Sequence, residues 1–127
     1  MALITQPVAS IITSDDDVAA WAKTPQVDNG IESATAGAAT LSKYSGVITS
    51  EALTTAAAAL YTLTITNTKA AAGQVAFASL SNGTNSQGTP HVVSVTPGAG
   101  TLVIVIRNDH ASQALNGTIK IAFAIVG

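Results

Sequence analysis

The chain has 127 residues, of which 9% are charged and 47% hydrophobic, with a formal net charge of -2 and no cysteine. Ordinary soluble domains carry about 25% charged residues, and interspersed charge is what normally prevents self-association. The composition therefore predicts one domain that belongs to an assembly. It argues against a nucleic-acid partner, which requires clustered Lys and Arg, and against disulfides and thiolate metal sites.

Two further absences shape the expectations about location. No run of residues approaches the roughly 18 to 20 apolar residues that a membrane-spanning helix requires. The first ten residues, MALITQPVAS, have no basic region and contain Pro7, so they do not resemble a signal peptide. We expect no membrane partner and a protein made in the cytoplasm.

Residues 1–36 differ in kind from the rest and predict an extended N-terminal arm. Within it, Ser14 can cap a short helix at residues 15–23, because Asp15 to Asp17 would favour the positive end of the helix dipole and Pro25 would stop it. The apolar residues of the arm need a surface on which to dock. The candidates for an interface with a partner protein or a second subunit are Ile4, Ile11, Ile12, Val18 and Trp21.

A low-complexity bridge at Ala34 to Thr40 leads into residues 37–127, which predict a small antiparallel β-sandwich or barrel, jelly-roll-like in its all-β character. Tyr61 to Thr66 alternates apolar residues with threonines, so one face is buried. Leu53 to Leu60 is interpreted as strand, or as a loop leading into a strand, rather than as an alanine-rich helix. In Gln74 to Ser81, Val75 and Phe77 share one side, and Phe77 is expected in the core.

The C-terminal third predicts two hairpins. His91 to Thr96 and Thr101 to Asn108 flank the turn Pro97 to Gly100, and Thr118 to Val126 follows the loop Asp109 to Gly117 as the partner of the second hairpin. In the last strand Ile119, Ile121, Phe123 and Ile125 share one face, and Lys120, Ala122, Ala124 and Val126 share the other. Both faces of LVIVIRN, Leu102 to Asn108, are apolar, so we expect Val103 and Val105 at or beside a subunit interface.

Candidate catalytic and binding residues are few. Asp109 beside His110 suggests a triad fragment, but neighbouring residues point apart and no GxSxG motif is present. The acidic run at residues 15–17 has an N-cap explanation, and the glycines match no phosphate-binding motif. We therefore expect no catalytic residue, no cofactor, no metal and no enzyme activity.

The segments SGVITSEALTTAAAALYTLTITNT, GQVAFASLSNGTNSQGTP and VVSVTPGAGTLVIVIRNDHASQALNGTIKIAFAIVG resemble small Thr/Ala-rich β-proteins of tailed-bacteriophage virions, of the capsid decoration (cement) type. This resemblance implies a homotrimer on the capsid surface of the virion, bound to the major capsid protein and stabilising the shell. An alternative is a tail fibre or spike module that binds a host-surface glycan through the loops Ser81 to Pro90 and Asp109 to Gly117.

Overall fold

The computed structural model describes residues 29–127, and within them the chain is all-β. The helix predicted at residues 15–23 and the interface candidates Ile4, Ile11, Ile12, Val18 and Trp21 lie outside the described residues. The strands are β2 (Asn29–Ser33), β3 (Ala38–Thr40), β4 (Ser45–Thr49), β5 (Leu60–Thr66), β6 (Val75–Asn82), β7 (Pro90–Gly98), β8 (Thr101–Asn108) and β9 (Ile119–Val126).

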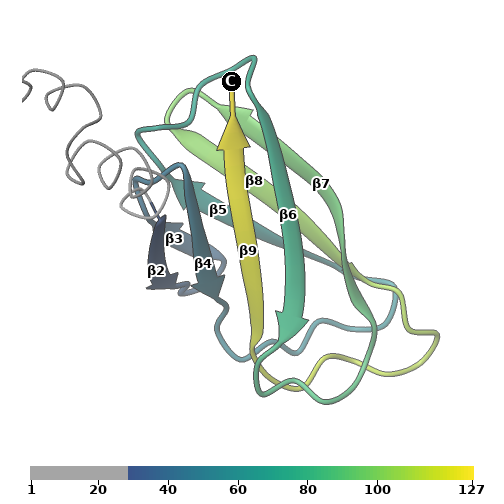
Figure 1. Ribbon diagram of the computed structural model, residues 1–127. Helices are drawn as coiled ribbons and strands as arrows, with labels where there is room; N and C mark the ends of the chain where they lie inside the picture. The colour runs from purple at the N-terminus through teal and green to yellow at the C-terminus, as the bar shows by residue number, and fades with distance from the viewer. Residues whose placement is uncertain (1–28) are drawn as a thin grey trace, which may run out of the picture.

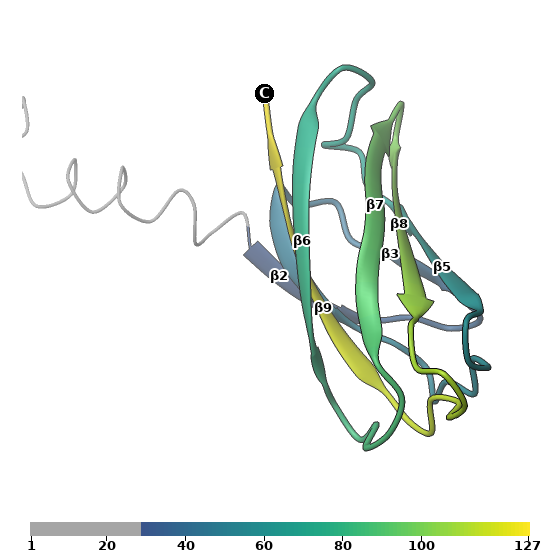
Figure 2. The same cartoon turned by 90° about the vertical axis from the view of Figure 1, so that its right-hand side faces the viewer.

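The described strands form two four-stranded sheets, with the orders β2-β4-β9-β6 and β3-β5-β8-β7. Figure 1 looks onto the first sheet, and Figure 2 shows the two sheets as two layers. The sheets are mixed rather than purely antiparallel, because β2 runs parallel to β4 and β3 runs parallel to β5. Every other pairing of named strands in this part of the chain is antiparallel.

The core lies between the two sheets and is built by strict alternation along the central strands. Tyr61, Leu63 and Ile65 point inward from β5, as the alternation with threonine predicts. The inward sides of β8 and β9 complete the core with Leu102, Ile104 and Ile106 and with Ile119, Ile121, Phe123 and Ile125. The face predicted for the last strand is therefore confirmed.

The first predicted hairpin, β7 with β8, is confirmed, whereas the second is wrong. The turn between β7 and β8 is tighter than expected, because Gly98 already pairs with Thr101. Strand β8 pairs with β5 and β7, while β9 pairs with β4 and β6 in the other sheet. The loop from Asp109 to Gly117 thus carries the chain from one layer of the sandwich to the other.

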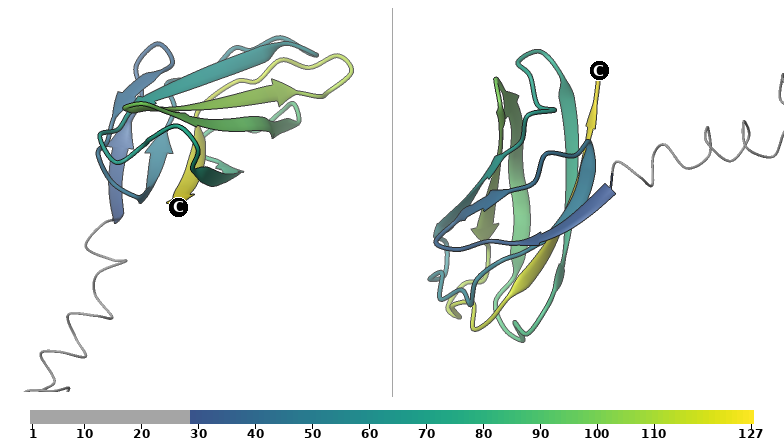
Figure 3. Two further views of the ribbon diagram at one scale, coloured as in Figure 1. Left: turned by 90° about the horizontal axis from the view of Figure 1, so that it is seen from above. Right: turned by 90° about the vertical axis from the view of Figure 1, so that its left-hand side faces the viewer.

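Two edge strands were not predicted. β2 and β3 follow one another but belong to opposite sheets, and the tight turn between them has positive φ at Ala36 and Gly37, as in a type I′ turn. The sheet thus includes Asn29–Ser33, which precede the expected start of the sandwich at residue 37. Figure 3, right, views the side of the sandwich where these strands lie. Leu53 to Leu60 is irregular until β5 begins.

Candidate functional site: the apolar outer face of one sheet

The outward side of the β2-β4-β9-β6 sheet carries an apolar surface, here named the outer apolar face. Its members on β4, β6 and β9 alternate with residues that face the core, and Ile31 on β2 lies in register with Val47. They are Ile31, Val47, Val75, Phe77, Ala122, Ala124 and Val126.

The register of the sheet brings these residues together in rows. One row runs across all four strands as Ile31, Val47, Ala122 and Ser79. In the next, Phe77 pairs with Ala124, and this row continues through Ser45 to Asn29, where the Ser45 hydroxyl donates to Asn29 Oδ1 at 3.1 Å. Beyond it Val75 pairs with Val126. Cross-strand neighbours stand about 5 Å apart, so the side chains form a continuous surface rather than scattered contacts.

The large side chains of this face are open to solvent. Ile31 is 79% exposed, Phe77 62%, Val75 58% and Val126 54%. A groove of about 460 Å³ runs along the face between Ile31, Val47 and Ala122, with Lys120 on its lining. Contiguous exposed apolar surface of this kind marks a site of interaction with another surface.

The orientation of β6 corrects the sequence prediction for Phe77. The inward side of β6 is formed by Ala76, Ala78 and Leu80, which pack against the core, so Val75 and Phe77 face outward. Both sides of this strand are apolar, and its pairing with β9 determines which side is buried. Alternation within β6 alone therefore could not reveal the face.

Val103 and Val105 lie on the opposite side of the molecule, on the outward surface of β8. Val103 pairs with Thr64 on one side and Thr96 on the other, and both valines are half-buried. Val105 is flanked in the same way by Thr62 and Ser94. The hydroxyl-bearing neighbours thus screen the second apolar side of LVIVIRN within one sheet.

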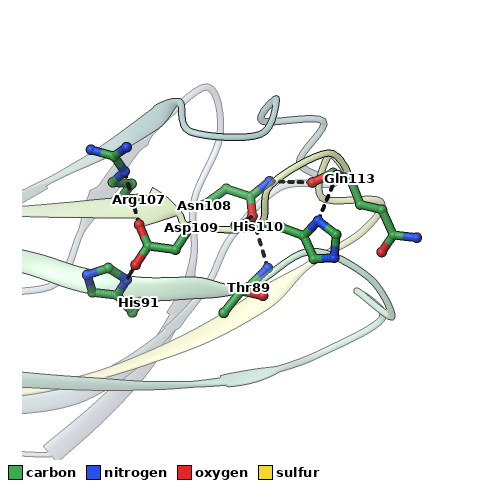
Figure 4. A network of polar contacts seen from close by, with 7 residues as sticks. All are labelled: Thr89, His91, Arg107, Asn108, Asp109, His110 and Gln113. Atoms are coloured by element: carbon green, nitrogen blue, oxygen red, sulfur yellow. Dashed lines mark hydrogen bonds and ion pairs between the residues drawn. The ribbon is translucent and has the colours of Figure 1, made fainter.

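Charged groups gather at one end of that second sheet (Figure 4). The Asp109 carboxylate contacts His91 Nδ1 and lies 3.0 Å from Arg107 Nε. The ring of His110 is turned to its own loop, where Nδ1 accepts hydrogen bonds from the backbone N–H groups of Ser112 and Gln113 at 3.0 and 2.9 Å. Asp109 and His110, adjacent in sequence, therefore serve different contacts and form no pair.

The neighbouring Asn108 is fully buried and organises the chain where it leaves β8. Its Oδ1 accepts hydrogen bonds from the N–H groups of Thr89 and His110 at 2.9 and 3.2 Å. Its Nδ2 donates to the carbonyls of Thr55 and Gln113 at 3.1 and 2.8 Å. All four bonds satisfy backbone groups of loops, so this amide has a structural role.

The two polar loops considered for glycan recognition bind each other. Asn116 Oδ1 accepts from the Ser86 N–H at 2.8 Å, and Asn116 Nδ2 donates to Ser86 Oγ at 3.0 Å. The N–H of Asn116 donates to Asn85 Oδ1 at 2.8 Å, and Asn85 Nδ2 donates to the Gln87 carbonyl. The side-chain amides of Asn85 and Asn116 therefore already make hydrogen bonds within the protein, which leaves fewer donors and acceptors for a glycan.

One titratable group shows a clear perturbation. Burial raises the pKa of the Tyr61 hydroxyl well above its ordinary value, and the nearby Glu51, which accepts a hydrogen bond from it at 2.9 Å, raises this pKa further. The phenol is therefore neutral at physiological pH and acts as a donor. Its inward position on β5 makes it a residue of the core rather than part of a cleft.

Two searches of the described residues bear on other kinds of site. Residues 29–127 hold no cluster of three or more His, Asp or Glu side chains arranged to bind a metal ion. No helix in the part of the chain that the structure describes is long and apolar enough to cross a membrane.

Comparison with known proteins finds no matching family model, no matching curated protein and no matching solved structure. The residues of this chain are therefore the guide to its function, and the outer apolar face is its most distinctive surface.

Proposed function

We propose that this protein is a structural subunit of a larger assembly and that its outer apolar face is a contact surface in that assembly. The specific form that we propose is a virion protein that binds the major capsid protein on the outer surface of a phage shell as an oligomer, a homotrimer by analogy, and stabilises the shell. The observation that carries the proposal is the solvent exposure of Ile31, Phe77, Val75 and Val126 on one sheet.

The charge distribution supports a contact surface on this side. Across the rows from Val75 to Ser81, the only charged side chain on the outward surface of β4, β9 and β6 is Lys120. Few charges need to be desolvated when such a surface is covered, so its burial is favourable. At about 25 cal/mol per Å² of apolar surface, each roughly 100 Å² of apolar side chain that is covered on this face contributes about 2.5 kcal/mol before association costs.

The opposite face is mixed, with hydroxyls beside its valines. Its outward positions include Thr62, Thr64, Ser94 and Thr96 next to Val103 and Val105. The strands of this sheet also carry the exposed Leu60 and Val93. A subunit bound to a shell needs one side that contacts the shell and another side that faces water. We therefore infer that the assembly contact uses the outer apolar face and that the threonine-bearing face is turned to solvent.

A glycan-binding tail fibre or spike module is the weaker proposal. Its loops, Ser81 to Pro90 and Asp109 to Gly117, lie together as such a site requires, but Asn85, Asn108 and Asn116 use their amides to hold those loops in place. Binding of the intact protein to a glycan array, with loss on loop substitution, is the result that would favour this alternative.

The test of the main proposal combines analytical ultracentrifugation with co-sedimentation on expanded phage capsid shells. We expect a concentration-dependent oligomer and saturable binding to shells. A protein that stays monomeric at high concentration and does not sediment with shells would contradict the proposed function.

A further inference from the structure

The outer apolar face has dimensions that a short chain segment can cover. Four strands about 4.8 Å apart, followed over the six steps of about 3.3 Å from Val75 to Ser81, give at most roughly 400 Å². A standard interface buries about 800 Å² on each partner. A segment can therefore cover the face of one subunit, whereas a stable shell contact combines the faces of several subunits.

The chain itself offers a segment of matching size and composition. Residues 1–28 contain the apolar positions Ile4, Ile11, Ile12, Val18 and Trp21, and they join the sandwich at Asn29, the first residue of β2. A helix is about 10 Å wide, so the helix predicted at residues 15–23 covers about half the width of the face. Residues 1–14 are then available for the other half.

The point of attachment favours contact with the face of the same chain. β2 is an edge strand of this sheet, and Ile31 on β2 is one wall of the groove. Trp21 precedes Asn29 by a stretch that spans up to about 28 Å when extended. The groove lies only one to two strand spacings, about 5 to 10 Å, from β2. A short tether gives an effective concentration in the millimolar range, so the chain's own segment outcompetes free copies.

Charge gives the segment a preferred orientation. Lys120 is exposed on the lining of the groove and makes no ion pair with any residue of the described part of the chain. Asp15, Asp16 and Asp17 are the only run of three like charges in the sequence. Placed with this run beside Lys120, the predicted helix directs Val18 and Trp21 toward the groove between Val47 and Ala122.

We propose that residues 1–28 of each chain cover the outer apolar face of that same chain before assembly, with Trp21 in the groove and the acidic run at Lys120. The segment shields the face from premature self-association. A shell engages many copies at once, and this multivalency allows it to displace the segment. This inference rests on the proposed function in one respect: the same face contacts residues 1–28 before assembly and the shell afterwards.

Disulfide trapping tests the contact directly, because the natural chain has no cysteine. In the double variant Ala22→Cys with Ala122→Cys, mild oxidation should give an intramolecular disulfide, seen as a faster monomer band on a non-reducing gel and a mass loss of two hydrogens. The matched control pairs Ala22→Cys with Thr62→Cys, which is exposed on the opposite face. Equal trapping in both pairs, or disulfides only between chains, would overturn the proposal.

The single tryptophan gives a second readout that needs no cysteine. Trp21 in the full chain should emit at shorter wavelength than a solvated indole and resist acrylamide quenching. Lys120→Glu should shift the emission to longer wavelength and raise the quenching constant at least twofold, since it sets a carboxylate against the acidic run. Arg107→Glu, the same kind of charge change on β8 of the other sheet, should leave both unchanged. A fully solvated signal in the natural protein would overturn the contact.

These outcomes are separable from those of the proposed function. Trapping and fluorescence report on the isolated chain, whereas sedimentation reports on the shell. A chain that binds shells but shows no trapping keeps its proposed function and loses this inference.

Discussion

The two outer faces of the sandwich differ in the residues that flank their outward valines. On the β8 side, Val103 and Val105 stand between threonines and a serine. On the β9 side, Val47 stands between Ile31 and Ala122, and the row reaches a hydroxyl only at Ser79 on β6. All three valines are half-buried, so the difference between the faces lies in the chemistry of the neighbouring side chains.

The largest expected effect is a difference in stability between substitutions on the inner side and on the outer side of β9. Ile121 is fully buried and Ala122, the next residue, is exposed. Ile121→Ala should lower the free energy of unfolding by about 2 to 5 kcal/mol, because it removes buried methyl groups and leaves a cavity. Urea denaturation followed by circular dichroism measures this loss.

The matched control for that experiment is Ala122→Ser, which should change stability by less than about 0.5 kcal/mol, as surface substitutions generally do. Equal losses in the two variants would show that the outer apolar face is part of the folding core and would remove the contrast between the faces.

An intermediate effect on stability at alkaline pH is expected for Tyr61, on the inner side of the threonine-bearing sheet. Because the pKa of Tyr61 is raised on folding, the folded state holds this proton more tightly than the unfolded state does. The resulting stabilisation is complete below pH 10, the ordinary tyrosine pKa, and declines above it by about 1.4 kcal/mol per pH unit until the folded-state pKa is reached.

Chemical denaturation at pH 9 to 11 measures this slope, and Tyr61→Phe should abolish it. Tyr44→Phe should retain the slope, since Tyr61 is intact in that variant. A slope that survives Tyr61→Phe would assign the alkaline sensitivity to another group.

The smallest effect is expected at the charged end of the second sheet. Asp109→Asn removes the contacts with His91 and Arg107, whose side chains are about half exposed. Exposed pairs contribute about 0 to 1 kcal/mol, so thermal unfolding should shift only slightly and the shift should shrink at high salt. A loss of shell binding in this variant would indicate that the contact surface lies on the second sheet rather than on the outer apolar face.

Sequence patterns predicted the parts of the fold in which one side of a strand is clearly polar. Tyr61 to Thr66 alternates with threonine, and Ile119 to Ile125 alternates with small or charged residues, so the buried side of each was predicted and found. The β7–β8 hairpin was also predicted, because the turn residues Pro97 to Gly100 separate two apolar runs.

The predictions failed where long-range pairing decides the structure. β2 and β3 are short edge strands whose partners lie far along the chain, so local pattern gave no sign of them. The loop after β8 was interpreted as a hairpin, but the buried Asn108 redirects the chain to the other sheet.

The candidate site was only partly predictable for the same reason. Ala122, Ala124 and Val126 were recognised as one side of the last strand, but Phe77 was expected inside. Both sides of β6 are apolar, and only its pairing with β9 shows which one is exposed. The surface therefore emerges from four strands together, because β2 and β4 were not singled out from the sequence and β6 was given the wrong buried side.

In the proposed assembly one outer face makes the contact and the other faces water. Co-sedimentation of Val47→Lys and Val105→Lys with expanded capsid shells tests it most directly, since each variant places one lysine at the centre of one face. We predict at least a tenfold loss of shell binding for Val47→Lys and near-normal binding for Val105→Lys, with both variants folded by circular dichroism. Normal binding by Val47→Lys together with loss in Val105→Lys would contradict the account.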